Sequence, residues 1–229
     1  ALILIMYRNQ RHTNFLIHSE KEKTERLMLN ILPFEIAKEL KEKGKTSPQS
    51  FDNVTVLFSD LVDFTQITAD LEPEIVINEL NDIFTHFDYI MENNQCERIK
   101  TIRDAYLSVC GMPENNARHA HNIVQSAIEI IQYIQNRNEN HQIKWSVRIG
   151  IHTGRVVGGV VGTKKYIYDI FGDTINTTSR IENCSLPMQV SISETTYLQV
   201  KNDFNFTQEN KFEIKGKGVV KTYCLYTEI

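Results

Sequence analysis

The feature that most constrains the fold of this chain is the regular alternation of short apolar runs with amphipathic segments after residue 51. Asn53–Ser59 is a β-branched run, which is typical of a buried strand. Pro73–Asn93 carries apolar residues at helical spacing and begins with a proline, which suits a first helical turn. The alternation predicts an α+β fold in which helices cover a mainly antiparallel sheet.

The remaining segments continue this alternation. A tight turn at Arg103–Asp104 is expected to join two strands, and a glycine pair is expected to interrupt the last strands. The other predicted strands are 96–102, 105–111, 144–151, 189–192 and the region 204–226. The other predicted helices are 115–136, 173–183 and 194–201.

Composition excludes several function classes. The chain has 229 residues, of which 25 are basic and 29 acidic, giving a net charge of −4. A non-specific nucleic-acid binder needs a surplus of Lys and Arg, so no nucleic-acid partner is expected. The four cysteines form no C-x-x-C pair, which argues against a zinc ribbon and a thioredoxin-like dithiol. A domain of this size needs no disulfide framework, and a reducing cytosol fits it best.

The first residues are apolar from Ala1 to Tyr7, and Arg8 and Arg11 follow at once. Seven residues cannot cross a bilayer, which takes about 20. The pattern resembles the last turns of a membrane helix that leaves on the cytoplasmic side. The alternative is a short helix end that packs on the domain.

A charged, glycine-free segment from Thr13 to Lys43 predicts a helix, with Pro33 expected to end or kink it. Its apolar stripe allows a parallel two-stranded coiled coil or a single amphipathic helix lying on the domain. We therefore divide the chain into residues 1–43 (end of a membrane helix and signalling helix), a linker at 44–50 and a globular domain at 51–229.

Asp60 and Asp104 are the first candidates for chemistry, because each stands where an apolar strand meets a turn. Two carboxylates that converge from neighbouring strand ends would suit Mg²⁺ or Mn²⁺ together with phosphate. Taken singly, each aspartate is better explained as an ordinary turn residue.

Four segments in order resemble motifs of the class III nucleotidyl cyclases, and the resemblance covers about residues 51–229. The segments are Phe58–Thr65, Lys100–Tyr106, Tyr168–Arg180 and Ile214–Gly218. Leu29–Pro33 also resembles the helix that enters such domains from a membrane or sensor module. The resemblance implies a ferredoxin-like core preceded by a signalling helix.

The resemblance also implies roles for single residues. Asp60 and Asp104 would bind two divalent ions, Mg²⁺ or Mn²⁺, while Asn176 orients the ribose and Arg180 binds the charge that gathers on the α-phosphate. Three further residues are expected to bind the substrate: Lys215 at the terminal phosphates, Lys164 as a weaker candidate for the same task, and Phe64 in the first motif.

Base choice is expected to rest on Lys100 and Asp169. Family guanylyl cyclases place Glu and typically Cys at these positions, whereas a Lys donor and an Asp acceptor complement adenine. The sequence therefore predicts an adenylyl cyclase (adenylate cyclase) that converts ATP into 3′,5′-cyclic AMP and pyrophosphate. The resemblance implies a head-to-tail homodimer on the cytoplasmic face of a membrane, downstream of a membrane or sensor domain.

Two residues depart from the family pattern, since Asp63 and Arg103 stand where the family usually has glycine. We expect their charges to face each other and partly cancel. The alternatives are a weak or silent cyclase-like domain used for dimerisation or nucleotide sensing, and a guanylyl cyclase.

Overall fold

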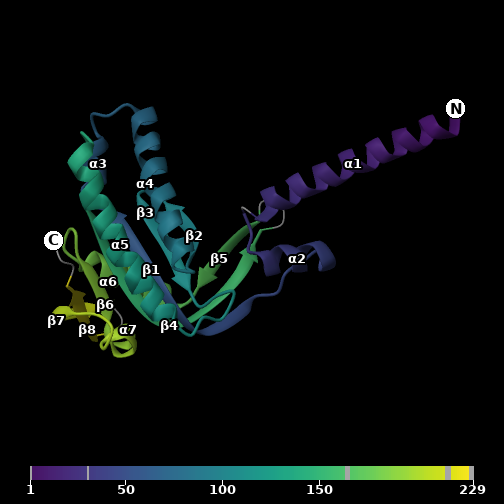
Figure 1. The fold of residues 1–229 in the computed structure, drawn as a ribbon. Helices are drawn as coiled ribbons and strands as arrows, with labels where there is room; N and C mark the ends of the chain where they lie inside the picture. Colours follow the sequence, from purple (N-terminus) through teal and green to yellow (C-terminus); the bar gives the residue numbers. More distant parts are fainter. Residues whose placement is uncertain (1, 30, 163–165, 215–217, 227–229) are drawn as a thin grey trace. The chain divides into compact units, whose positions relative to one another are not determined.

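Helices and strands alternate along the chain (Figure 1). The computed structural model describes residues 2–29, 31–162, 166–214 and 218–226. The helices are α1 (Leu2–Leu29), α2 (Phe34–Lys43), α3 (Phe64–Thr68), α4 (Pro73–Asn93), α5 (His119–Asn140), α6 (Asp173–Asn183) and α7 (Glu194–Val200). The strands are β1 (Gln49–Leu61), β2 (Glu97–Ile102), β3 (Ala105–Cys110), β4 (Val147–Val161), β5 (Ile167–Phe171), β6 (Val190–Ser193), β7 (Phe206–Ile214) and β8 (Gly218–Leu225).

The strands form one mixed sheet in the order β2-β3-β1-β4-β6-β8-β7, and β5 pairs with β4. Neighbouring strands in this order run antiparallel except β4 and β6, which are parallel. The expectation of an α+β fold with a mainly antiparallel sheet is confirmed.

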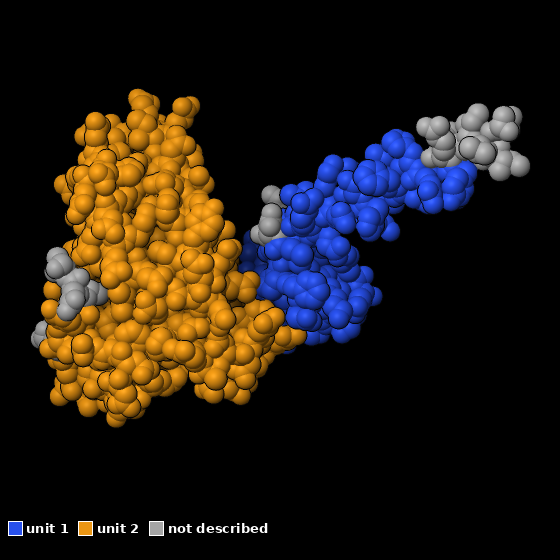
Figure 2. All heavy atoms as spheres, in the orientation of Figure 1, with its two compact units in different colours: residues 1–48, 159–168 blue, residues 49–158, 169–229 orange. Residues whose placement is uncertain are grey.

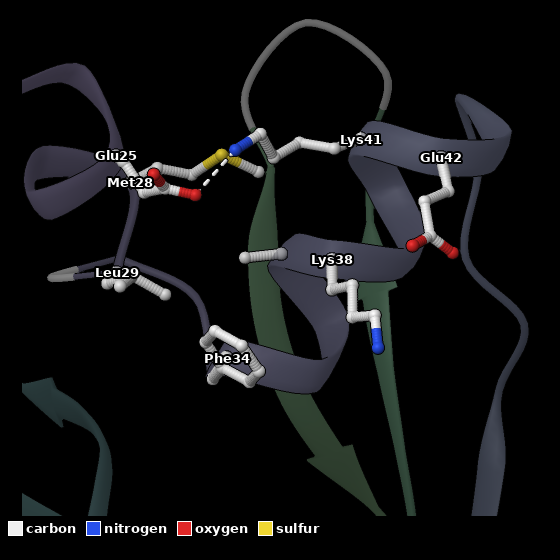
Figure 3. A pocket seen from close by; sticks show the side chains of 8 residues that line it. Glu25, Met28, Leu29, Phe34, Lys38, Lys41 and Glu42 are labelled. Carbon is white, nitrogen blue, oxygen red and sulfur yellow. Dashed lines mark hydrogen bonds and ion pairs between the residues drawn. The ribbon is translucent and has the colours of Figure 1, made fainter. Parts of the chain in front are cut away.

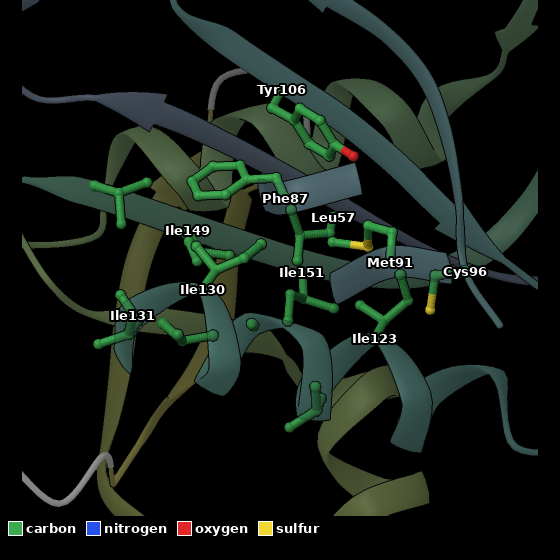
Figure 4. Packing of buried hydrophobic residues seen from close by; sticks show 14 of the residues in the cluster. Leu57, Phe87, Met91, Cys96, Tyr106, Ile123, Ile130, Ile131, Ile149 and Ile151 are labelled. Carbon is green, nitrogen blue, oxygen red and sulfur yellow. The ribbon is translucent and has the colours of Figure 1, made fainter. Parts of the chain in front are cut away.

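The hydrophobic core lies between α4, α5 and one face of the sheet (Figure 4). Phe87 from α4 and Ile130 from α5 meet Leu57 and Ile149 from the central strands, and all four are fully buried. Because successive side chains of a strand point to opposite faces, β1 and β4 direct a second set of side chains, among them Asp60 and Arg148, to the other face of the sheet.

The described part of the chain divides into two compact units (Figure 2). The first comprises residues 1–48 and 159–168, and the second comprises residues 49–158 and 169–229. The candidate site residues that the structure describes all lie in the second unit.

In the first unit, α1 ends before Pro33 and α2 begins directly after it, as expected of a proline inside a helical pattern. Lys41 on α2 forms an ion pair with Glu25 on α1 at 2.6 Å, beside a cavity of about 200 Å³ (Figure 3). Within the described residues, no helix is long and apolar enough to cross a membrane.

Candidate active site

Asp60 lies near the end of β1 on the face of the sheet opposite the core. Leu57 and Leu61 belong to the core cluster, so the alternation along the strand turns Asp60 the other way. Asp60 pairs across the strands with Arg148 on β4, and Arg148 Nη2 donates a hydrogen bond to Asp60 Oδ2 at 2.8 Å. A cation therefore already partners this carboxylate.

Arg148 also reaches a second carboxylate, Glu182 on α6. Arg148 Nε donates to Glu182 Oε1, and the Glu182 side chain is only 3% exposed. Burial raises the pKa of Glu182 to about 7, although Arg148 acts in the opposite direction. Arg148 thus connects the end of β1 to helix α6 through two charge-assisted hydrogen bonds.

Asp104 follows β2 in the turn that leads into β3 and is close to Asp60. Asp60 pairs with Ala105, and the backbone N–H of Leu61 donates to the carbonyl oxygen of Asp104 at 3.4 Å. Burial raises the pKa of Asp60, and the negative charge of Asp104 raises it further. The structure therefore brings together the two carboxylates that were expected to form one site.

Helix α6 packs closely on β4 because two strand positions lack side chains. A Cβ at Gly150 would lie 2.2 Å from the backbone nitrogen of Glu182, which no side chain could occupy. A Cβ at Gly154 would lie 2.6 Å from the hydroxyl of Thr174, near the start of the same helix. These glycines set the distance at which Glu182 meets Arg148.

Lys100 on β2 and Asp169 on β5 form an ion pair, with Lys100 Nζ donating to Asp169 Oδ2 at 2.5 Å. Their side chains are 34% and 16% exposed, so the pair is partly desolvated. The other Asp169 carboxylate oxygen accepts a hydrogen bond from the backbone N–H of Ile170 at 2.8 Å. The two expected base-reading residues are thus direct neighbours.

Asn176 and Arg180 lie four residues apart on α6, which places them on the same side of the helix. Asn176 is exposed and Arg180 is partly buried. Helix α6 begins after Gly172, which takes a φ of 139° where a side chain would be strained. This helix therefore carries both the expected ribose and phosphate contacts and the buried Glu182.

Of the three further residues expected to bind the substrate, the structure describes Phe64. Phe64 begins α3, and its ring stacks on Trp145 with 5.7 Å between ring centroids, so the ring contributes to packing beside the core. Lys164 and Lys215 lie outside the described residues.

Asp63 and Arg103 both adopt a left-handed backbone conformation, with φ values of 55° and 58°. Glycine takes this conformation without strain, whereas a side chain costs about 1 kcal/mol or more, least for Asp. Within the described part of the chain, no ion pair joins these two residues. Compensation between their charges at longer range stays a prediction.

The chemistry of the Asp60 and Asp104 pair fits a divalent cation. Hard cations such as Mg²⁺ prefer carboxylate oxygens, and the mutual repulsion that raises the pKa of Asp60 is relieved when a cation lies between the groups. Within the described residues, no cluster of three or more His, Cys, Asp or Glu side chains could hold a metal. The site therefore suits ions whose other ligands come from the phosphates of a substrate.

Arg148 and Glu182 were not among the residues expected from the sequence. Arg148 lies in a strand with the usual alternation of apolar and polar residues, and no local sequence feature distinguishes it from other polar strand residues. Its position opposite Asp60 depends on the register between β1 and β4, 88 residues apart at this pair. Only the tertiary pairing reveals the contact.

Comparisons with known proteins agree with this architecture. The family model described as "Adenylate and Guanylate cyclase catalytic domain" matches residues 46–227. The chain is 40% identical over 212 residues to "Guanylate cyclase 2D" of Rattus norvegicus, which covers 90% of this chain. The chain spans 19% of the length of that relative.

Two solved structures share the fold. One is the catalytic core of a rhodopsin-guanylyl cyclase with converted specificity in complex with ATPalphaS, with a TM-score of 0.75 and 34% identity over 80% of this chain and 100% of that chain. The other is a non-canonical dimeric guanylyl cyclase domain of the RhoGC fusion protein from Blastocladiella emersonii. It has a TM-score of 0.73 and 30% identity, and covers 78% of this chain and 98% of that chain.

The expectation of an adenylate cyclase acting on ATP is wrong, because curated relatives that match 90% of this chain at about 40% identity are guanylate cyclases. The physical reason lies in the pair Lys100 and Asp169. Side by side, these residues offer one donor and one acceptor. Adenine presents an acceptor at N1 and a donor at N6, whereas guanine presents a donor at N1 and an acceptor at O6. The pair therefore suits either base: Lys100 would face N1 of adenine or O6 of guanine, and Asp169 would face the other group.

Proposed function

The chain belongs to the family of adenylate and guanylate cyclase catalytic domains, and from this premise we propose that it is a guanylyl cyclase. It would convert GTP into 3′,5′-cyclic GMP and pyrophosphate. The observation that carries this proposal is the 40% identity to a guanylate cyclase over 90% of the chain. The adjacent carboxylates Asp60 and Asp104 support it, because the reaction needs divalent cations that neutralise the charged phosphates.

The proposed reaction needs no nucleophile from the protein, because the 3′-hydroxyl of the ribose attacks the α-phosphorus. Asn176 on the exposed side of α6 would donate to and accept from the ribose and fix its orientation. Arg180, one turn later, would donate hydrogen bonds to the oxygens on which negative charge gathers. We also propose that Lys215 and Lys164 act at the terminal phosphates, as the resemblance implies.

Asp60 and Asp104 would hold two divalent ions, which when bound lower the pKa of the ribose hydroxyl and neutralise the phosphates. Arg148 keeps one Asp60 oxygen in a fixed direction through its 2.8 Å hydrogen bond. Glu182 fixes Arg148 in turn from the buried side of α6. These contacts would hold the Asp60 carboxylate in one rotamer before the substrate arrives.

Guanine can be read by the pair that the chain provides. The ammonium group of Lys100 would donate to guanine O6, while the carboxylate of Asp169 accepts from the N1–H group. The partial burial of both side chains would make each of these bonds stronger than in water.

We propose that the active unit is a head-to-tail homodimer in which each site takes groups from both chains. Asp60 and Asp104 would come from one chain, and Lys100, Asp169, Asn176 and Arg180 from its partner. One similar solved structure is of a dimeric guanylyl cyclase domain, which supports an assembly of two chains. A symmetric dimer of this kind contains two equivalent sites.

Mixing two inactive variants tests this arrangement. Asp104→Ala and Arg180→Ala should each abolish cyclic GMP formation, because every site in either homodimer lacks one group. In an equal mixture, half the dimers are mixed and have one intact site of two, so activity should recover to about a quarter of wild type. If the mixture stays as inactive as its components, sites shared between chains are excluded.

We also propose that the chain operates on the cytoplasmic face of a membrane, downstream of a sensor domain. The cationic residues Arg8 and Arg11 after an apolar stretch support this placement. The much greater length of the rat relative is consistent with further domains in the complete protein.

A further inference from the structure

Two cysteines, Cys96 and Cys110, lie opposite each other at the base of the β2–β3 hairpin. Glu97 on β2 pairs with Val109 on β3 in an antiparallel register. Cys96 immediately precedes Glu97, and Cys110 immediately follows Val109, so the two cysteines occupy the next opposed positions. Opposed residues of antiparallel strands have Cα atoms about 4.5–5.5 Å apart, which lies within the range that a disulfide spans.

The thiols of both cysteines point to the turn at Asn94 and Gln95, which joins α4 to β2. Cys110 Sγ donates to the carbonyl oxygen of Gln95 at 3.2 Å, and Cys96 Sγ donates to the carbonyl oxygen of Asn94 at 3.4 Å. Cys96 is 6% exposed and Cys110 is 1% exposed. Figure 4 shows Cys96 at the edge of the core, beside Met91 and Ile123.

The two sulfurs also interact with each other. Contact between the two side chains lowers the pKa of Cys110 and raises the pKa of Cys96. The thiolate is the reactive form of cysteine, so the direction of these shifts favours Cys110 over Cys96 as the thiol that reacts first.

A polar cavity of about 290 Å³ lies at the same turn and opens to solvent. Asn94 and Gln95, whose carbonyl groups accept the two thiol hydrogen bonds, line it together with Arg118 and Asn122. The amide of Asn122 also lowers the pKa of Cys110. The cavity therefore brings solvent to the residues that contact the two sulfurs, and Arg118 adds a cationic side chain to its lining.

We propose that Cys96 and Cys110 form a redox modification site, a dithiol that a peroxide oxidises to an intramolecular disulfide. The Cys110 thiolate attacks one peroxide oxygen, the O–O bond breaks, and the leaving hydroxide takes up a proton to become water. Cys96 sulfur then attacks Cys110 sulfur, the S–S bond forms, the S–O bond breaks, and a second water leaves. The dithiol loses two hydrogens and two electrons, and the peroxide is reduced to two waters.

The disulfide would close the hairpin that carries Lys100 and leads to Asp104. A covalent bond at its base limits the conformations of the unfolded hairpin and so stabilises the folded one. Oxidation would therefore act on the segment that supplies two of the proposed active-site residues, without contact between the oxidant and the site.

Peptide mapping tests this proposal on the full chain. The reduced protein is treated with increasing hydrogen peroxide, the remaining thiols are alkylated in denaturant, and the digest is analysed by mass spectrometry. We expect the peptides with Cys96 and Cys110 to be joined, lighter by two hydrogens, and the melting temperature to rise. Cys224 is the matched control, because it is also buried but contacts Ser191 and Asn210 instead of a second thiol in the described structure.

Cys96→Ser separates the two chemical steps. Without the second thiol, the sulfenic acid on Cys110 should persist and be trapped by dimedone, while Cys224 stays unlabelled. The proposal is overturned if both cysteines remain fully alkylated at a peroxide dose that oxidises the partly exposed Cys184. It is also overturned if the variant labels Cys110 no more than Cys224.

Discussion

Replacing Arg148 by methionine should destabilise the protein mainly through the buried carboxylate that it leaves behind. Arg148 bonds both Asp60 and Glu182, and its side chain is 29% exposed, whereas that of Glu182 is 3% exposed. Removing one partner of a buried ion pair costs about 3–5 kcal/mol. Because Glu182 already has a pKa of about 7 in the wild type and can stay protonated in the variant, we expect a smaller loss, about 1.4 kcal/mol of unfolding free energy at about pH 8.

The pH dependence identifies the cause. Burial already raises the pKa of Glu182 to about 7, and losing Arg148 raises it further. A raised carboxyl pKa contributes stability that is present at low pH and is lost as the pH rises through the folded value. The penalty of Arg148→Met should therefore be small near about pH 5.5, where Glu182 is protonated in both proteins, and larger by about 1.4 kcal/mol near about pH 8, one pH unit above the wild-type pKa.

Urea denaturation of four proteins measures this effect: wild type, Arg148→Met, Glu182→Gln and the double variant. The double variant should recover most of the stability lost in Arg148→Met at about pH 8, because no buried charge remains. An equal penalty at both pH values, or a double variant as unstable as Arg148→Met, would refute the assignment of the cost to Glu182.

Three further perturbations have distinct expected results. Burial raises the pKa of Glu97 to about 6, so the stability that its protonated form provides is complete at low pH and is lost as the pH rises through that value. Glu97→Gln should reduce the fall in unfolding free energy between about pH 5 and pH 8 by about 1 kcal/mol. An unchanged dependence of the unfolding free energy on pH, measured by urea denaturation, would contradict this. Gly150→Ala should cost several kcal/mol, on the order of 3 or more, because its Cβ would overlap the backbone of Glu182. The control Gly159→Ala, whose nearest non-adjacent atom is at 3.6 Å, should change the melting temperature little, and equal losses would count against the close helix packing. Arg103→Gly should raise stability by about 0.5 kcal/mol because it relieves a φ of 58°, and a lower melting temperature would show that the side chain compensates for the strain.

Much of the fold could be predicted from local patterns. The helices Pro73–Asn93 and Asp173–Asn183 have the predicted boundaries, because each combines a start signal with a continuous apolar face. The first strand extends from Gln49 to Leu61, beyond the predicted Asn53–Ser59, because its outer residues gain their strand conformation from pairing with β4. Pairing of this kind depends on distant segments and leaves little trace in the local sequence.

The site residues that lie at strand ends and turns could be predicted from the sequence. Those whose contacts depend on the register between strands could not. Asp60 and Asp104 lie close together as expected, since strand ends and turns can be recognised from the sequence. Arg148 and Glu182 were missed because their partners are set by strand pairing and helix packing. The base was wrongly predicted because the residue types at Lys100 and Asp169 do not fix the order in which a purine presents its donor and acceptor.

The most direct test of the proposed function is to resolve the cyclic products that the purified chain forms from GTP and from ATP with Mn²⁺ or Mg²⁺. We expect cyclic GMP from GTP, little cyclic AMP from ATP, and loss of the product in Asp104→Ala. Cyclic AMP as the main product, or cyclic GMP that persists in Asp104→Ala, would contradict the proposed guanylyl cyclase.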